Sequence, residues 1–415
     1  MASLLKRLSL RTPTVVSPPQ AVTNVQTGAN HLLAFPTTTA APTKAVATLE
    51  KALDDFYFLL FDTPYSPKGA ATPKTTATPS ATATTLNPNP SSKTDRTPHP
   101  TTTTATTAAP LPPVSFTLVN LIVQEDIDLF QPLLLILAHL NFEHRKLVAI
   151  LFNHFYRHHE VFRDHVLTKT ILLDFLVSGY SPGQRAICIN CHHILYECIK
   201  KDKRLVAWLL QSKHLLAFFQ QHCVSDDFEV QSKAFTIFAA LFKLYTKTSA
   251  THVKNNHEAY FDLYNTVLKQ GNYVVQVQFL KLLGDLLVER KWRKVMVLYV
   301  NRKENLMVIM KMLKHKSVNI QVEAFHVFKI FVANPEKDDR VEHVFSSNIK
   351  KLIKLMKKFL NEKVQQDDEL FEERKTVLET LQQIKAEKDM QEEAEVVKEE
   401  KEESVGLVPL PIAPR

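Results

Sequence analysis

Glycine and proline are scarce through most of this 415-residue sequence. Of the 22 prolines, sixteen precede Val114 and three lie in the last seven residues, so that only Pro132, Pro182 and Pro335 fall between. The same central stretch holds four of the 7 glycines. Sheet proteins need such residues at their turns, and phosphate-binding loops need closely spaced glycines. The scarcity therefore excludes a sandwich, a barrel, a Rossmann sheet and a P-loop, and predicts one long helical body.

Cysteine and long apolar runs are also in short supply. Four cysteines without an apolar secretory segment indicate free thiols in a reducing compartment, and we expect a cytoplasmic protein. No run of about 18 apolar residues occurs, so we expect no membrane span. The first thirteen residues, MASLLKRLSLRTP, are basic and free of acid, which is also typical of mitochondrial presequences. A mitochondrial presequence is therefore kept as the alternative.

Composition divides the chain into five segments. Residues 1–45 lack apolar periodicity and predict a disordered extension, whereas residues 46–62 repeat large apolar side chains at helical spacing and predict the first helix of the body. Residues 63–113 are rich in Thr, Ala and Pro and predict a low-complexity insertion. Residues 114–386 predict the main helical domain. Residues 387–415 predict a disordered acidic tail, with nine acids and three lysines between Glu387 and Glu403.

An internal repeat indicates the architecture. The pattern aliphatic-Gln-x-x-(Ala/Phe)-(Phe/Leu)-x-aliphatic-(Phe/Leu) begins at Val230, Val275 and Ile320, with an offset of 45 residues each time and weaker copies upstream. Units of this length with two or three helices are typical of armadillo and HEAT repeats. We therefore predict an all-α, right-handed, armadillo/HEAT-like solenoid with a concave binding face. In the last copy we expect Asn319 as N-cap and Asn334-Pro335 as the stop.

Two clusters of cysteine and histidine have spacings that metal or haem sites use. The sequence Cys188-x-x-Cys191-His192 has haem-attachment spacing and forms half of a zinc site, but a secretion signal and a second ligand pair are missing. Cysteines packed as small core residues are the preferred interpretation. His154 and His158 share one helical face without a third ligand. We expect no metal, no cofactor, no small-molecule substrate and no catalytic residue, and hence no enzyme.

Three sequence stretches resemble one known family. They are Gly271–Arg290 (GNYVVQVQFLKLLGDLLVER), Glu304–Met310 (ENLMVIM) and Asn319–Pro335 (NIQVEAFHVFKIFVANP). They are similar to the calcium-binding protein 39 family, which includes the fungal hymA-like proteins. The similarity is strongest from Tyr180 to Leu360. Despite the family's name, the sequence has no calcium-binding loop.

The resemblance implies a function and a set of sites. Family members are non-catalytic, armadillo-like scaffolds that activate a Ste20-type serine/threonine kinase or pseudokinase in polarised growth and morphogenesis, and that take a Trp-Glu-Phe-like C-terminal peptide from the partner. The resemblance places the kinase contacts of the concave face at Phe228, Tyr273, Val277, Arg290 and Arg293. It places the peptide pocket at Met310, Ser347 and Lys351.

Three of these positions depart from the family pattern. Val277 stands where the family has a basic residue, Arg293 where it has an aromatic one, and Ser347 where it has a lysine. A lost lysine removes a charged hydrogen bond of roughly 1.5–3 kcal/mol. We therefore expect a weaker or altered partner contact at these positions. Separately, we expect the chain to be a monomer.

Two other functions stay open at this point. An armadillo-type adaptor would bind peptides, but the regular Asn/Trp ladder of such adaptors is missing. A nucleic-acid-binding repeat protein would use the basic cluster at Lys350, Lys351, Lys354, Lys357 and Lys358, although a solvated helix face is the simpler interpretation of that run. We therefore do not expect nucleic acid as the partner.

Overall fold

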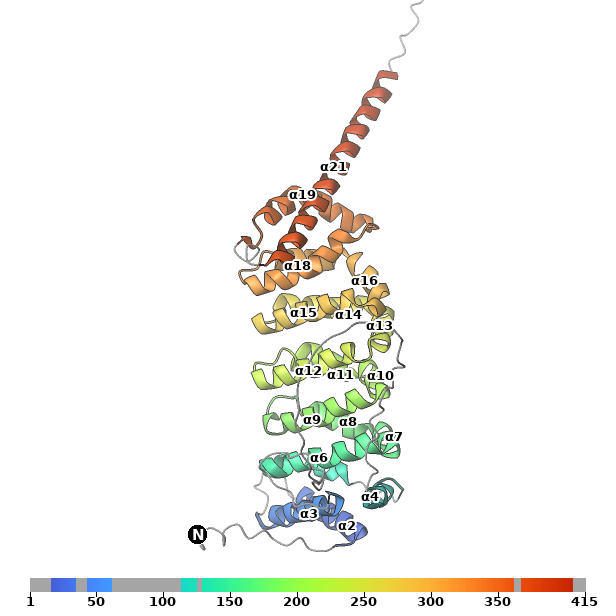
Figure 1. Cartoon of the computed structure of the whole chain (residues 1–415), viewed down its shortest axis with the longest axis vertical. Helices are drawn as coiled ribbons and strands as arrows, with labels where there is room; N and C mark the ends of the chain where they lie inside the picture. Colours follow the sequence, from blue (N-terminus) through green and yellow to red (C-terminus); the bar gives the residue numbers. More distant parts are fainter. Residues whose placement is uncertain (1–15, 35–42, 62–112, 125–128, 362–366, 406–415) are drawn as a thin grey trace, which may run out of the picture. The chain divides into compact units, whose positions relative to one another are not determined.

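All regular structure in the described part of the chain is helical. The computed structural model describes residues 16–34, 43–61, 113–124, 129–361 and 367–405, and no strand occurs among them (Figure 1). The chain divides into two compact units, Met1–Phe175 and Leu176–Arg415. The predicted all-α helical-repeat solenoid is confirmed.

The first unit is built from helices that enclose an aromatic core. Phe130 contacts Phe152 and Phe162 with ring centroids 5.0 and 5.4 Å apart, and Phe56 reaches Phe155 at 6.3 Å. Edge-to-face pairs at such distances are favourable beyond their buried area. The helices are α2 (Pro18–Leu33), α3 (Thr43–Phe61), α4 (Pro113–Gln124), α5 (Phe130–Leu135), the 3₁₀ turn η1 (Leu137–His139), α6 (Phe142–His158), α7 (Glu160–Thr168) and α8 (Thr170–Ser178), which crosses the boundary of the units.

Helix α2 corrects the expectation that residues 1–45 are irregular. Its buried residues, Ala21, Val22, Val25, Ala29 and Leu32, recur at helical spacing and pack on α3. Most of them are small, so the stripe does not stand out beside the prolines around it. Pro18 lies at the first position of the helix, where its fixed φ and its missing N–H are tolerated. The expected helix at 46–62 corresponds to α3. The expected insertion lies outside the described residues, apart from Pro113.

The second unit is a series of helices that continues the repeat found in the sequence. Its elements are α9 (Arg185–Lys201), α10 (Lys203–Gln211), α11 (Lys213–Ala217), the π-helical turn η2 (Phe218–His222), α12 (Phe228–Lys243), α13 (Thr246–Asn255), α14 (His257–Gln270), α15 (Tyr273–Val288), the 3₁₀ turn η3 (Arg290–Trp292), α16 (Arg293–Val300), α17 (Lys303–Met312), α18 (Val318–Ala333), α19 (Asp339–Lys358) and α21 (Asp368–Val405). Helices α9, α12, α15 and α18 pack one on the next, which Figure 1 shows as successive layers.

Helices α12, α15 and α18 begin 45 residues apart, and the repeated glutamine has a structural role in two of them. Gln276 donates from Nε2 to the Leu268 carbonyl at 3.0 Å, and Gln321 donates to the His315 carbonyl at 2.7 Å. The first bond satisfies a carbonyl in the last turn of α14, and the second satisfies a carbonyl in the turn that follows α17. Gln231 is buried at the equivalent position, but no partner for its Nε2 lies among the described residues.

Aromatic side chains join neighbouring repeats. Phe238 of α12 stacks on Phe279 of α15 with centroids 5.1 Å apart, and Tyr299 of α16 contacts Phe331 of α18 at 5.5 Å. All four side chains are buried. The core is therefore continuous from repeat to repeat, as expected for a solenoid whose units cannot bury their apolar faces alone.

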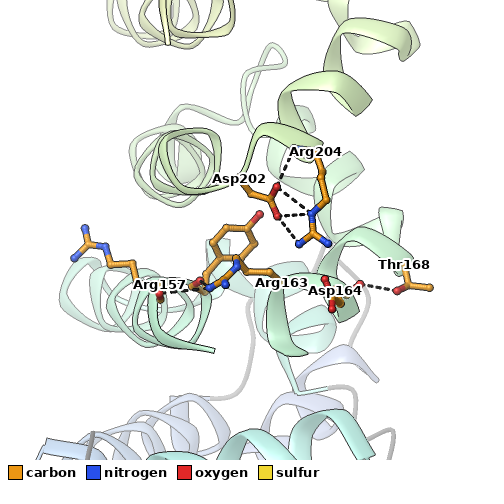
Figure 2. Close-up of polar contacts among 7 residues, drawn as sticks. Arg157, Arg163, Asp164, Thr168, Asp202 and Arg204 are labelled. Atoms are coloured by element: carbon orange, nitrogen blue, oxygen red, sulfur yellow. Dashed lines mark hydrogen bonds and ion pairs between the residues drawn. The ribbon is translucent and has the colours of Figure 1, made fainter. Parts of the chain in front are cut away.

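Short polar side chains cap the helix ends, and a glycine allows close packing after α8. Asp202 caps α10 by accepting from the Arg204 backbone N–H at 2.8 Å, and its carboxylate also lies 2.7 Å from Arg204 Nη2 (Figure 2). Gly179 has no room for a side chain, because a Cβ there would lie 2.6 Å from Cys191 Sγ. In α18 the N-cap is Ser317 rather than the expected Asn319, whereas Asn334 does end that helix.

Helix α21 corrects the expectation of a disordered tail from residue 387. The helix runs without interruption from Asp368 to Val405 and packs on α18 and α19 through its first part (Figure 1). The buried side chains Leu370, Val377 and Leu381 hold that first part. Frequent Glu and Lys residues, which favour helix, extend it beyond the packed region.

Candidate partner-binding surface

Three repeat helices begin with an exposed apolar residue. Phe228, Tyr273 and Val318 are the first residues of α12, α15 and α18, and they are 66%, 47% and 47% exposed. Asp227 and Asn272 cap the first two helices by accepting backbone N–H groups at 3.0 Å. The caps fix where each helix begins and therefore hold the aromatic side chains at equivalent positions of successive repeats.

Tyr273 is oriented by the next repeat. Its hydroxyl accepts a hydrogen bond from Asn319 Nδ2 at 2.8 Å. Val277 lies one turn further along α15 and is half-buried on the same face. Phe228, Tyr273 and Val277 thus lie at or near the starts of stacked helices. Sequence reasoning missed Val318 and Asn319, although the 45-residue period could have identified Val318 as the counterpart of Tyr273.

Arg290 and Arg293 lie at the other end of α15. Both are exposed, and neither makes an ion pair within the described ranges. A rise of 1.5 Å per residue places Val288, the last residue of α15, about 22 Å from Tyr273 along the helix axis, and the two arginines follow it in η3 and at the start of α16. Trp292, between them in sequence, is buried and contacts Phe242 with centroids 6.0 Å apart. The five predicted contact residues therefore form two groups, and only an extended or large partner can touch both.

A hollow of about 350 Å³ lies between α17 and α19. It is lined by Met307, Met310, Lys311, Lys314, Val344 and Asn348. Met310, which the resemblance places in a peptide pocket, is one wall of this hollow. Ser347 and Lys351 are exposed on α19 next to the lining residues, but they do not line it. The arrangement is an apolar floor with a basic rim.

The cysteines and His192 are buried in the core, whereas His154 is half-buried and His158 is exposed. All four cysteines are free and buried, and desolvation raises the pKa of Cys188 to about 11 and that of Cys191 further above its usual value. Thiols held in this way are poor nucleophiles. Burial lowers the pKa of His154 and of His192 to about 4, so both rings are neutral at pH 7. The interpretation of the cysteines as core residues is confirmed.

The described residues show neither a metal site nor a membrane-spanning helix. No three His, Cys, Asp or Glu side chains in these ranges come together as a metal site requires. No helix in the same part of the chain is both long and apolar enough to cross a membrane.

Comparison with known proteins is consistent with this geometry. The family profile described as Mo25-like matches residues 101–385. A degreening-related gene dee76 protein of Auxenochlorella protothecoides is 37% identical over 52% of this chain and 65% of its own length. The Mo25-like protein of Schizosaccharomyces pombe is 34% identical over 61% of this chain and 77% of its own. The human calcium-binding protein 39-like protein is 34% identical over 58% of this chain and 70% of its own.

The alignment thus reaches slightly less than two thirds of the algal relative and more than two thirds of the other two. The Mo25-like match spans well over half of the chain and includes the repeats, the exposed helix starts and the α17–α19 hollow. The resemblance to the calcium-binding protein 39 family is confirmed. The chain therefore belongs to the Mo25-like family, a family of scaffold-type proteins.

Proposed function

We propose that this chain is a non-catalytic scaffold that binds a Ste20-family kinase or pseudokinase and activates it allosterically. The observation that carries the proposal is the set of exposed apolar residues at the starts of α12, α15 and α18, in a chain of a scaffold-type family. Apolar and aromatic side chains that a monomer leaves exposed at regular positions are typical of protein interfaces. The scaffold acts by binding the active kinase conformation more tightly than the inactive one, which raises the population of the active state.

A second contact in this proposal is the α17–α19 hollow, which takes an apolar C-terminal peptide of the Trp-Glu-Phe type. Met307, Met310 and Val344 supply adaptable apolar contacts, and the lysines of the rim face the acidic residue and the terminal carboxylate. The replacement of a family lysine by Ser347 leaves Lys351 and the rim of α17 to supply the charge.

The four buried free thiols fit a reducing compartment, and we infer a cytoplasmic scaffold that serves polarised growth and morphogenesis. A fluorescent fusion of the full chain that labels mitochondria instead would contradict this location.

The direct test is peptide and kinase binding by the full chain. We expect Met310→Ala to weaken binding of a Trp-Glu-Phe-terminated peptide at least tenfold, because truncation of a central hot-spot contact costs about 2 kcal/mol or more. Tyr273→Ala leaves peptide binding unchanged but weakens capture of a purified Ste20-type kinase. Matched controls are Met390→Ala and Leu216→Ala, at side chains 69% and 44% exposed elsewhere. If both site variants bind peptide and kinase like the wild type, the proposed function is wrong.

A further inference from the structure

Five lysines form one exposed stripe along α19. Lys350, Lys351, Lys354, Lys357 and Lys358, here called the basic stripe, are all exposed. Their spacing of one, three or four residues places them within roughly a third of the helix circumference, while Val341, Phe345, Ile349, Leu352 and Met356 are buried on the other side. The stripe is therefore fixed in place by the packing of its own helix.

Among the described side chains, the lysines of the stripe have few acidic partners. No ion pair to Lys351, Lys354, Lys357 or Lys358 occurs among the described side chains. Lys350 lies near one acid, Asp389 of α21, whose pKa is lowered by its hydrogen bond to Lys385 and by the positive charges of this and other lysines. A run of like charges costs stability through repulsion, and a ligand of opposite charge relieves that cost.

The stripe continues directly from the α17–α19 hollow. Val344 and Asn348 line the hollow. Lys351 follows Asn348 by three residues, and Lys358 follows Lys351 by seven, so that both lysines lie close to the helix face of the lining residues. Lys311 and Lys314 add positive charge on the opposite wall. A partner peptide that leaves the hollow towards the C-terminal end of α19 therefore passes along lysine side chains.

The dimensions favour a short acidic peptide over nucleic acid. The nine residues of helix from Lys350 to Lys358 span about 12 Å, which matches about four residues of extended peptide. A nucleic acid duplex carries a charge every ~1.7 Å over its whole length and extends beyond the stripe in both directions. There it meets acidic side chains, because Asp339 and Glu342 begin α19, and the acidic helix α21 packs against α19 and runs past it (Figure 1).

We propose that the basic stripe binds an acidic segment of the partner, the residues immediately preceding the apolar C-terminal anchor held in the hollow. The inference rests on the proposed function for the anchor and adds a second, electrostatic half to the same site. Solvated ion pairs are individually weak, so several lysines act together and their effect falls with salt.

The test compares two labelled peptides of equal length by fluorescence anisotropy on the full chain. One has five glutamates before Trp-Glu-Phe, and the other has five glutamines. We expect the glutamate peptide to bind the wild type about tenfold more tightly in 50 mM salt, equal to about 1.4 kcal/mol. In 0.5 M salt the difference falls below twofold.

Charge-removal variants locate the effect. The triple variant Lys354→Gln, Lys357→Gln, Lys358→Gln should lose the glutamate advantage and keep its affinity for the glutamine peptide, since Lys351 and the hollow are untouched. The matched control Lys247→Gln, Lys254→Gln, Lys269→Gln removes the same charge from exposed positions of α13 and α14 and should keep the advantage. If both triple variants lose the glutamate advantage equally, the advantage depends on net charge alone, and the proposal that the basic stripe binds the peptide is wrong.

The remaining outcomes separate this inference from the proposed function. If the glutamine peptide binds in a Met310-dependent manner and the glutamate peptide binds no more tightly, the hollow binds the anchor but the basic stripe does not bind an acidic segment. If only the glutamate peptide binds, and the stripe triple variant abolishes this binding, the basic stripe binds the acidic segment and the assignment of the hollow to the anchor is wrong. Tighter, stripe-dependent binding of a 20-nucleotide RNA than of the glutamate peptide would assign the stripe to nucleic acid instead.

Discussion

His192 is a buried imidazole whose neutral form is built into the second unit. Its Nδ1 lies 3.2 Å from the hydroxyl of Tyr180, which is fully buried. Desolvation lowers its pKa to about 4, and the positive charges of Lys233 and His193 act in the same direction. The folded protein therefore binds this proton far more weakly than the unfolded chain, where the pKa is 6.5.

This difference predicts a pH dependence of stability. Between pH 6.5 and 4 the unfolded chain holds more protons than the folded one, so the free energy of unfolding falls as the pH falls through this window. We expect His192 to contribute about 2 kcal/mol to the loss between pH 7 and pH 5. In His192→Gln the difference between urea titrations at the two pH values should shrink by that amount. His343→Gln, an exposed histidine of α19, is the control. An unchanged pH difference in His192→Gln would show that the ring takes up its proton without cost.

At the scale of single helices, α21 combines a packed half with an acidic extension. Leu370, Val377 and Leu381 are buried, and Glu373 bridges Lys329 and His326 of α18. No described side chain after Leu381 is fully buried. The two halves should therefore differ sharply in their effect on stability.

Two truncations test this division. Removal of residues 391–415 should change the free energy of unfolding by less than about 0.5 kcal/mol, because the last buried side chain described on α21 is Leu381. Removal of residues 367–415 should cost at least about 4 kcal/mol, since three buried apolar side chains contribute about 1.5–3 kcal/mol each. Chemical denaturation of both proteins beside the full chain measures the effect. A large loss on the shorter truncation would mean that the acidic extension has stabilising contacts of its own.

The helices show which features the sequence could predict. The starts of α12, α15 and α18 were predictable because the 45-residue period places equivalent residues at equivalent positions. Helix α2 was missed because its buried face is mainly Ala and Val, which give a weak apolar signal. The side chain of Asn319 suits a cap, whereas its amide donates to the Tyr273 hydroxyl of the preceding repeat, a contact that no local pattern encodes.

The candidate sites depended more heavily on family resemblance than the fold did. Composition and periodicity gave no reason to separate Met310 from Met312, yet Met310 lines the hollow and Met312 is buried in the core. The two differ by 200° around one helix, but which face meets the core depends on tertiary packing. The basic stripe was visible as a run of lysines, and only the position of α19 beside the hollow connects it with a site.

At the scale of the molecule, the proposed function gives the two surfaces different tasks. Tyr273 and Met310 belong to the same compact unit, so one partner can engage both surfaces. A peptide bound in the hollow raises the local concentration of the attached kinase at the helix starts, without itself favouring an active conformation. Contacts at the helix starts favour the active state, because a ligand shifts an equilibrium only through unequal affinity for the two states.

Titration of kinase activity with the scaffold separates these tasks. Met310→Ala should shift the half-maximal scaffold concentration upward at least tenfold and leave the activity plateau unchanged, because loss of tethering is overcome by mass action. Tyr273→Ala should lower the plateau at least threefold, since excess scaffold cannot restore a lost preference for the active state. Met390→Ala and Leu216→Ala should follow the wild-type curve. A lower plateau for Met310→Ala, at an unchanged half-maximal concentration, would show that the peptide contact itself activates the kinase and that the two surfaces do not divide the work in this way.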